Sequence, residues 1–289
     1  RKTTHRQRRE PKERFGEMLQ VDGSQHPWLE GRGALQPDLL NAIDDATKRV
    51  FLQFAPAEST EAVMRLLYDY ISMYGRPLAI YADRHSIYQT TRDASIDEQL
   101  QGLEPETQVG RALRELGIRY IPAGSPQAKG RVERSFGTLQ DRLVKELRLE
   151  GISDIDSANR FLKEHFIDDH NERFASDRAN YSDAHLPLGN LNLDAILSHQ
   201  ETRTVANDYT ISYHNTSYQI APESILPGLR SSKVIVERRL DGSIHVRFRG
   251  AYLSVAALPP SPTKASQRRQ PKPRREPTGV TPDDDHPWR

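Results

Sequence analysis

Three acidic residues, Asp22, Asp83 and Glu133, stand where the sequence predicts that secondary structure ends or begins. Asp22 closes the strand-like run GEMLQVD, and Asp83 closes the run RPLAIYAD. Glu133 lies in the first turn of an expected helix, whose apolar residues recur every three or four positions. In open sheets, ligands bind beyond the carboxyl ends of the strands. Strands that place Asp22 and Asp83 side by side would therefore bring both acids under Glu133.

Three carboxylates at one point repel each other, and a divalent cation relieves that repulsion. Oxygen ligands without His or Cys select Mg²⁺ or Mn²⁺. Two such ions can activate a water or a hydroxyl group and stabilise the leaving oxygen of a phosphodiester. The three acids therefore predict metal-dependent phosphoryl transfer.

Each acid also has a plainer structural interpretation. Asp22 fits a turn and Asp83 fits a cap at the end of a strand. Glu133 fits an ordinary first helical turn, where the helix dipole favours a carboxylate. Asp44 and Asp45 are acids at a strand end too, and we interpret them mainly as a hairpin turn. Asp22, Asp83 and Glu133 together form a pattern that is much rarer by chance than any one of these acids alone.

The elements that must position these acids follow from the hydrophobic periodicity. We expect a strand ending at Asp22, two strands within 39–55, a helix over 58–75, a strand over 76–83, a helix over 107–117, a strand over 118–123, the helix that carries Glu133, and a helix over 155–171. The helix caps are Ser59 or Thr60 for the first helix and Ser153 or Asp154 for the last. This order predicts a mixed sheet with helices on both faces.

The remaining segments differ in character. Residues 84–106 are polar and too long for a simple connection. After a loop over about 172–203, residues 204–258 read as a small all-β module, expected to be a barrel, with a hairpin at His214 and Asn215 and a two-residue turn at Asp241 and Gly242. Residues 1–14 form a basic arm, and 259–289 are rich in Pro, Ser, Arg and Asp, so both tails are expected to be disordered.

Composition narrows the function classes. The 289 residues contain no cysteine, which excludes disulfides, thiolate zinc sites and cysteine nucleophiles. No apolar run is long enough to span a bilayer, and no signal peptide opens the chain, so we expect a cytoplasmic protein without a membrane partner. The net charge is only +1, but Lys and Arg crowd both tails, a distribution typical of contact with phosphate backbones.

Three motifs carry a family resemblance: QVDGSQHPWL, IYADRHS and SPQAKGRVERSFGTLQDRL. In this order they resemble the acid motifs of DDE-type transposases of bacterial insertion sequences and of the retroviral integrase catalytic core. AIDDATKRV resembles the second strand and turn of that family. HNERFAS with HLPLG, at 170–176 and 185–189, resembles the motif after its core. The resemblance covers about residues 15–190, and the third motif is the most specific.

The resemblance implies an RNase H-like catalytic core over 15–190, with Asp22, Asp83 and Glu133 as catalytic ligands of two Mg²⁺ (or Mn²⁺) ions. Asp22 would bridge both ions. The reaction would be hydrolytic nicking at a transposon end, followed by attack of the freed 3′-hydroxyl on target DNA. The module over 204–258 would bind DNA. Such enzymes work in the bacterial cytoplasm as homo-oligomers that pair two DNA ends.

The resemblance also implies DNA-contacting and site-lining residues. The residues expected to contact DNA phosphates are Lys129, Arg131, Arg134 and Arg142. His26 and His85 follow the two aspartates closely and are candidates to line the site, although lone histidines are more often structural.

The chain departs from the family in two respects. The second and third acids are 50 positions apart, longer than in retroviral integrases, and the stretch 86–106 accounts for this as an insertion. A helix-turn-helix domain that reads the transposon ends would be expected before residue 1. Two alternatives remain: an RNase H-like nuclease that stops at hydrolysis, and a catalytically inactive DNA-binding protein, against which the presence of all three acids argues.

Overall fold

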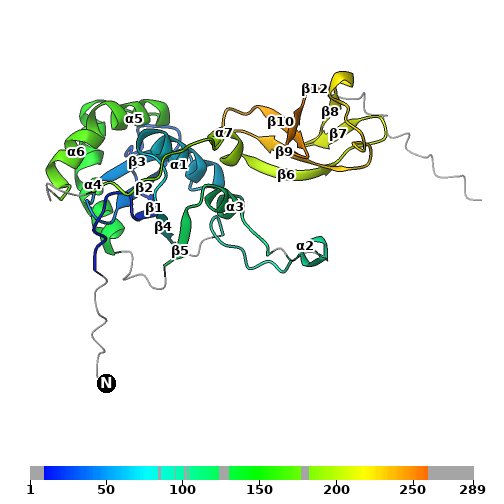
Figure 1. Cartoon of the computed structure of the whole chain (residues 1–289). Helices are drawn as coiled ribbons and strands as arrows, with labels where there is room; N and C mark the ends of the chain where they lie inside the picture. Colours follow the sequence, from blue (N-terminus) through cyan, green and yellow to red (C-terminus); the bar gives the residue numbers. More distant parts are fainter. Residues whose placement is uncertain are drawn as a thin grey trace, which may run out of the picture.

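The computed structural model describes residues 10–83, 86–94, 96–100, 102, 104–123, 130–176 and 182–259. Most of both predicted disordered tails lies outside these ranges. Figure 1 shows an elongated molecule with two lobes, an α/β core and a smaller β lobe, joined near helix α7 (Leu193–Ile196). No helix within the described ranges is long and apolar enough to cross a membrane.

The core is a mixed sheet between helices, as predicted. Its strands are β1 (Leu19–Gln25), β2 (Asp38–Asp44), β3 (Val50–Ala55), β4 (Ala79–Ala82) and β5 (Arg119–Pro122). Its helices are α1 (Thr60–Tyr74), α2 (Ile96–Leu100), α3 (Gln108–Glu115), α4 (Gly130–Leu149), α5 (Ile155–Phe161) and α6 (Ile167–Phe174), with a π-helical turn, Leu162–Phe166, between the last two.

The strand order in the sheet is β3-β2-β1-β4-β5. β2 is antiparallel to both β1 and β3, whereas β4 is parallel to β1 and to β5. All strands except β2 therefore point the same way. Their carboxyl ends share one edge of the sheet, which we call the carboxyl edge.

Helices cover both faces because successive side chains of a strand point to opposite sides. Leu40 and Ala42 of β2 pack in a core with α1 and α3. Leu39 and Ile43 pack in a second core with α4, α5 and α6. The sheet is thus the middle layer of three.

Local signals placed the helices correctly. The expected apolar stripe of α4 is buried throughout, at Val132, Phe136, Leu139, Leu143 and Leu147. Of the alternative N-caps, the structure uses Ser59 and Asp154, whose side chains each accept a backbone N–H from the first helical turn. The helix periodicity and the capping rules are confirmed by these contacts.

The open edge of β3 is closed by two asparagines. The Asn159 side chain accepts the Phe54 N–H at 2.7 Å and donates to the Phe54 carbonyl at 3.0 Å. Asn171 makes the same pair with Val50, at 2.7 and 3.0 Å. In a regular α-helix with 3.6 residues per turn, Asn171 would be rotated by about a third of a turn around the helix axis from Asn159. The π-helical turn between them uses extra residues per turn and brings both amides to the strand.

Several element bounds differ from those predicted. β1 continues past Asp22 to Gln25, because β2 still pairs with it as far as Asp38. The stretch 86–106 contains the short helix α2, on an arm that extends from the core in Figure 1. The expected loop over 172–203 contains the end of α6, helix α7 and strand β6 (His199–Thr204), so the β lobe begins before residue 204.

The β lobe, residues 199–257, consists of two antiparallel sheets around one apolar core. Its other strands are β7 (Thr210–Tyr213), β8 (Thr216–Ile220), β9 (Lys233–Arg238), β10 (Ile244–Phe248), β11 (Ala251–Leu253) and β12 (Val255–Ala257). The sheet orders are β11-β10-β9-β6 and β12-β8-β7. The chain passes from one sheet to the other at Ser254, between β11 and β12. The expected barrel is therefore seen as two sheets around one core, and its closure stays a prediction.

The two predicted hairpin turns have different outcomes. His214 and Asn215 connect β7 to β8 with φ values of 45° and 60°, as a two-residue turn of this kind requires. The turn at Gly242 is longer than predicted. Because the Arg239 N–H bonds to the Ser243 carbonyl at 3.0 Å, three residues lie in the loop, and Gly242 takes φ 83°.

Candidate active site

Asp22 and Asp83 lie level with each other at the carboxyl edge. The parallel pairing of β1 with β4 ends at Gln20 and Tyr81, and the same register carried two residues further sets Asp22 opposite Asp83. Val21 packs in the core beneath α1, so the next side chain along β1, that of Asp22, is on the face covered by α4. The structure therefore brings these two predicted acids together.

A pair of stacked tyrosines supports the strand end at Asp83. The Tyr120 hydroxyl donates to the Asp83 carbonyl oxygen at 2.6 Å. Its ring stacks on Tyr88, with centroids 5.7 Å apart and an interplanar angle of 5°. Burial raises the pKa of Tyr88 well above its ordinary value, and the charges of Glu58, Asp83 and Asp22 raise it further. The Tyr88 hydroxyl is buried without a hydrogen-bond partner among the described residues.

Glu58 is a further acid at this edge, and the sequence analysis missed it. It follows β3, whose carboxyl end lies at the same edge as that of β1. Its backbone N–H donates to the Asp38 carboxylate at 2.8 Å. Gly23 directly follows Asp22. The Glu58 carboxyl group occupies the space that a Cβ atom on Gly23 would need, so it packs against this glycine. The rule that ligands bind beyond strand ends would have found Glu58 if it had been applied to the third strand.

The start of α4 is held to the sheet by an ion pair between the partly buried Arg131 and the fully buried Asp45. The Arg131 Nε lies 3.1 Å from Asp45 Oδ1, and its Nη1 donates to the Asp45 carbonyl at 2.6 Å. Asp45 is 0% exposed and also accepts from the Gln20 amide and the Lys12 backbone. Of the expected DNA-contacting residues, Arg131 is thus engaged inside the protein.

A second contact ties the same helical turn to the strand partner of Asp22. Asn41 pairs with Asp22 across β1 and β2, and its side chain donates to Ser135 Oγ at 2.9 Å. Glu133 lies two residues earlier on α4 and is exposed. The helix that carries Glu133 is therefore fixed over the strand that carries Asp22.

Hard oxygen ligands such as Asp22, Asp83 and Glu133 suit Mg²⁺ or Mn²⁺ by their chemistry. The described part of the chain contains no group of three or more His, Asp or Glu side chains arranged to hold a metal ion. The structure therefore brings two of the predicted ligands together, but does not place Glu133 with them in one coordination group.

The remaining predicted site residues have different surroundings. Lys129 and His85 lie outside the described ranges. Arg134 is exposed on the first turn of α4. His26 is half-buried, with its ring against Trp28 at a centroid distance of 5.0 Å.

Arg142 is held by neighbours within the core. Its Nη2 lies 2.9 Å from both Glu146 and Asp169, and its guanidinium stacks on Phe166 and Phe174. The Arg142 guanidinium also lowers the pKa of Asp169. Arg142 therefore joins α4 to α6.

The interpretation of Asp44 and Asp45 as turn residues is confirmed. Asp44 Oδ1 accepts the N–H groups of Ala46 and Thr47, at 3.1 and 2.7 Å, and the Thr47 hydroxyl at 2.8 Å. Burial raises the pKa of Asp44, against the effect of these hydrogen bonds.

The motif at 185–189 has a structural explanation in the buried ring of His185. Its Nδ1 lies 2.6 Å from Asp183, and its Nε2 lies 2.8 Å from the Tyr70 hydroxyl. The ring occupies the space that a side chain on Gly16 would need. His185 thus ties the segment after the core to α1 and to the beginning of the chain.

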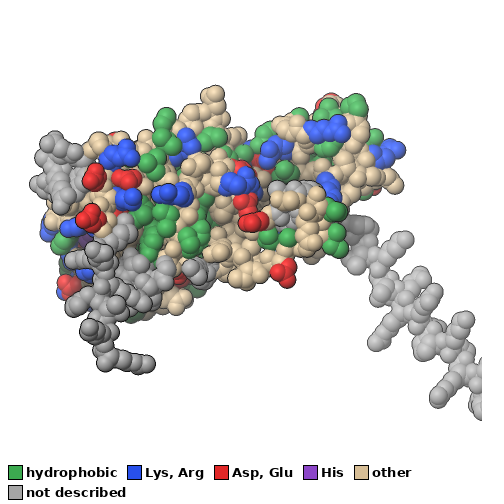
Figure 2. All heavy atoms as spheres, turned by 60° about the horizontal axis from the view of Figure 1, so that its bottom comes forward, with side chains coloured by type: hydrophobic (Ala, Val, Ile, Leu, Met, Phe, Trp, Pro, Cys, Tyr) green, Lys and Arg blue, Asp and Glu red, His purple; other side chains and the backbone are tan. Residues whose placement is uncertain are grey.

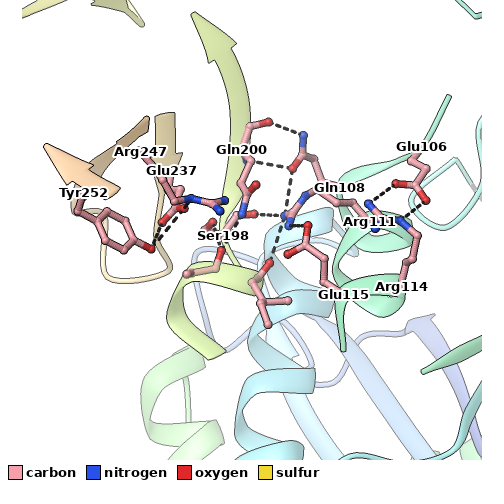
Figure 3. A network of polar contacts seen from close by, with 12 residues as sticks. Glu106, Gln108, Arg111, Arg114, Glu115, Ser198, Gln200, Glu237, Arg247 and Tyr252 are labelled. Carbon is pink, nitrogen blue, oxygen red and sulfur yellow. Dashed lines mark hydrogen bonds and ion pairs between the residues drawn. The ribbon is translucent and has the colours of Figure 1, made fainter. Parts of the chain in front are cut away.

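The two lobes are joined by polar contacts between α3 and the segment around β6 (Figure 3). The Gln108 side chain donates to the Gln200 carbonyl at 2.8 Å and accepts the Gln200 N–H at 2.9 Å. Arg111 donates to the Ser198 carbonyl at 2.6 Å and to the Ile196 carbonyl at 3.1 Å. These bonds fix the entry of the chain into the β lobe.

Comparison with known proteins confirms the resemblance to transposases. The chain is 40% identical over 255 residues to the Sinorhizobium fredii protein named "Putative transposase y4bF", which covers 86% of this chain and 54% of that protein. It is 30% identical over 285 residues to the transposase for insertion sequence IS1202 of Streptococcus pneumoniae, covering 96% of this chain and 59% of the relative. The chain thus spans little more than half the length of these curated relatives. No protein-family model matches the sequence.

Among solved structures, similar chains include retroviral integrases. The HTLV-2 integrase catalytic core domain in complex with magnesium has a TM-score of 0.36 and 18% identity, covering 51% of this chain and 82% of that one. A chain of a simian T-cell lymphotropic virus intasome has a TM-score of 0.41 and 16% identity, covering 87% and 82%. Similarities of this size carry no further conclusion for the present chain.

Proposed function

We propose that this chain is the catalytic part of a transposase that cuts and joins DNA by metal-dependent phosphoryl transfer. The observation that carries the proposal is the level placement of Asp22 and Asp83 at the carboxyl edge, beside the helix that presents Glu133. The names of the two curated relatives support it.

Asp22, Asp83 and Glu133 would hold the Mg²⁺ or Mn²⁺ ions, expected to be two. Bound there, the ions would activate the attacking water or 3′-hydroxyl and stabilise the leaving oxygen. The chain itself supplies position: Tyr120 holds the strand end at Asp83, and the Asn41–Ser135 contact holds α4 beside Asp22. The buried ring of Tyr88 and the partly buried ring of Tyr120 would limit water on one side of the acids.

The DNA would lie along the core and the β lobe. Figure 2 shows Lys and Arg side chains spaced along one face from the core to the β lobe, as phosphate contacts require. Arg134, next to Glu133, is placed to contact a phosphate near the acids, and Lys129, His26 and His85 remain candidates in the same region. We further propose that residues 15–190 are the catalytic unit, that the β lobe binds DNA, and that the protein acts in the bacterial cytoplasm as a homo-oligomer on paired transposon ends.

The test is a nicking and strand-transfer assay with MgCl₂ on duplexes that carry the cognate transposon ends. Asp22→Asn, Asp83→Asn and Glu133→Gln should each lose both steps while circular dichroism shows an intact fold. Asp141→Asn is the matched control, because Asp141 is an exposed acid on α4 paired with Lys145. Full activity of the three variants contradicts the carboxylate site. Wild type that nicks but never joins favours the nuclease, and wild type that binds DNA without cutting favours the inactive binding protein.

A further inference from the structure

A small pocket of about 310 Å³ lies between α4, α6 and the turn that connects β2 to β3. We call it the basic pocket. The polar side chains that line it and matter here are Lys48 of the turn, Arg131, Arg134 and Ser135 of α4, and His170 of α6. Its volume is near the lower end of the range of about 300–1,000 Å³ for ligand sites, which suits a phosphate group better than a large organic ligand.

The charge of the basic pocket is positive and largely uncompensated. No Asp or Glu lines it. Arg131 is neutralised by Asp45. Lys48 and Arg134 are exposed, and neither has an ion pair with any of the described residues. The pocket therefore presents two free cations to whatever enters it.

Two buried groups add hydrogen-bonding capacity at its wall. His170 is 3% exposed, and its Nδ1 has no hydrogen-bond partner within the described ranges. Its ring is held between Phe166 and Phe174, at centroid distances of 5.4 and 4.8 Å, so it cannot turn away at low cost. Ser135 Oγ accepts a hydrogen bond from Asn41, which leaves its own hydroxyl proton to donate. An unmade hydrogen bond at a buried group costs about 1–3 kcal/mol, and a ligand oxygen would remove that cost.

We propose that the basic pocket binds a phosphate group of the DNA backbone, with Lys48 and Arg134 as charge partners and Ser135 and His170 as neutral hydrogen-bond partners. Phosphate combines the features that the pocket selects: negative charge, several acceptor oxygens and small size. The inference rests on the proposed function for the identity of the phosphate as DNA. It extends that function, because it adds Lys48 of the β2–β3 turn, Ser135 of α4 and His170 of α6 to the residues expected to contact DNA. The phosphate would sit beside Arg134, one residue along α4 from Glu133.

The test is fluorescence anisotropy of a fluorescein-labelled duplex with the whole chain in EDTA, where no cutting occurs, over a series of NaCl concentrations. Lys48→Gln and Arg134→Gln should each weaken binding about 3- to 10-fold and lower the slope of log Kd against log [NaCl] by about 1, since one phosphate contact is lost. His170→Phe preserves the ring stack and should weaken binding with an unchanged slope, because a neutral group releases no counterion. Lys163→Gln is the matched control, since Lys163 is exposed on the π-helical turn and does not line the pocket.

A second measurement separates DNA from free phosphate. The ¹⁵N shifts of the His170 ring should move when the duplex is added, and should move less with potassium phosphate than with the duplex at matched ionic strength. Shifts that move with potassium phosphate at least as far as with the duplex show a site for the free anion and overturn the DNA assignment. Wild-type affinity and slope in both Lys48→Gln and Arg134→Gln overturn the pocket while leaving the proposed chemistry intact. If wild type shows these binding effects but does not nick DNA with MgCl₂, the proposed function is contradicted while the pocket stands.

Discussion

Arg131 in the first turn of α4 is bonded to Asp45, a fully buried acid in the turn after β2. The pair joins the helix that carries Glu133 to the central sheet. Arg131→Met removes the cation and leaves Asp45 with only its neutral partners. Breaking a buried ion pair in this way costs about 3–5 kcal/mol, and the Gln20 and Lys12 N–H groups reduce the expected loss to about 2–3 kcal/mol. Urea unfolding measures it, with the exposed neighbour Arg134→Gln as control. Equal stability of the two variants would show that the pair contributes nothing.

The closeness of Asp22 and Asp83 predicts a metal response that needs no DNA. Asp22→Asn removes one of two neighbouring negative charges, so without metal its melting temperature should equal or exceed that of wild type. Added MgCl₂ should stabilise wild type by about 1.4 kcal/mol when its concentration is tenfold above Kd, and should leave Asp22→Asn unchanged. Thermal melts with and without MgCl₂ decide this. An equal magnesium shift in both proteins would place the metal elsewhere.

His170 predicts a loss of stability in mild acid. Burial, helped by the Arg142 charge and opposed by Asp169, lowers the pKa of His170 to about 4 in the folded state. In the unfolded chain His170 has its ordinary pKa of about 6.5. The neutral ring therefore contributes fully to the free energy of unfolding above that pH, and this contribution is lost as the pH falls toward 4. The total is about 3 kcal/mol. His170→Phe should remove this slope, as measured by unfolding at about pH 7 and about pH 4.5. A parallel pH dependence in both proteins would contradict the prediction.

The two hydrogen bonds from Gln108 to the Gln200 backbone should help to attach the β lobe to the core. Gln108→Ala breaks both bonds to the Gln200 backbone and should weaken the docking of β6 by about 1–2 kcal/mol. The segment 190–198 should then be cut faster by protease, with the global melting temperature nearly unchanged. Gln99→Ala is the control, because the Gln99 side chain bonds to Ala94 within the arm of α2 and, among the described residues, to nothing in the β lobe. Identical cleavage of both variants would mean that other contacts fix the lobe.

Sequence periodicity predicted the core layers well because they depend on short-range patterns. The stripe of α4, the Ser59 and Asp154 caps and the mixed sheet all follow from spacing and end signals. The end of β1 was placed too early at Asp22, because the partner strand, and not the local sequence, decides how far a strand continues.

The candidate site was predictable only in part. Asp22 and Asp83 could be paired because each follows an apolar run that the sequence marks as a strand. Glu58 was missed because it lies in a connection, and its approach to Gly23 depends on tertiary packing. Arg131 was expected on DNA and instead pairs with Asp45, since sequence does not show which cation meets a buried acid.

The two asparagines that close β3 constrain how this chain can change in evolution. Adding or removing one residue between Asn159 and Asn171 would turn the second amide about 100° away from the strand and expose an unpaired sheet edge, a template for aggregation. The length of this helix should therefore be nearly invariant among relatives, whereas the arm that carries α2 is free to lengthen or shorten. Length variation among relatives should accordingly concentrate before α3 and be excluded between Asn159 and Asn171.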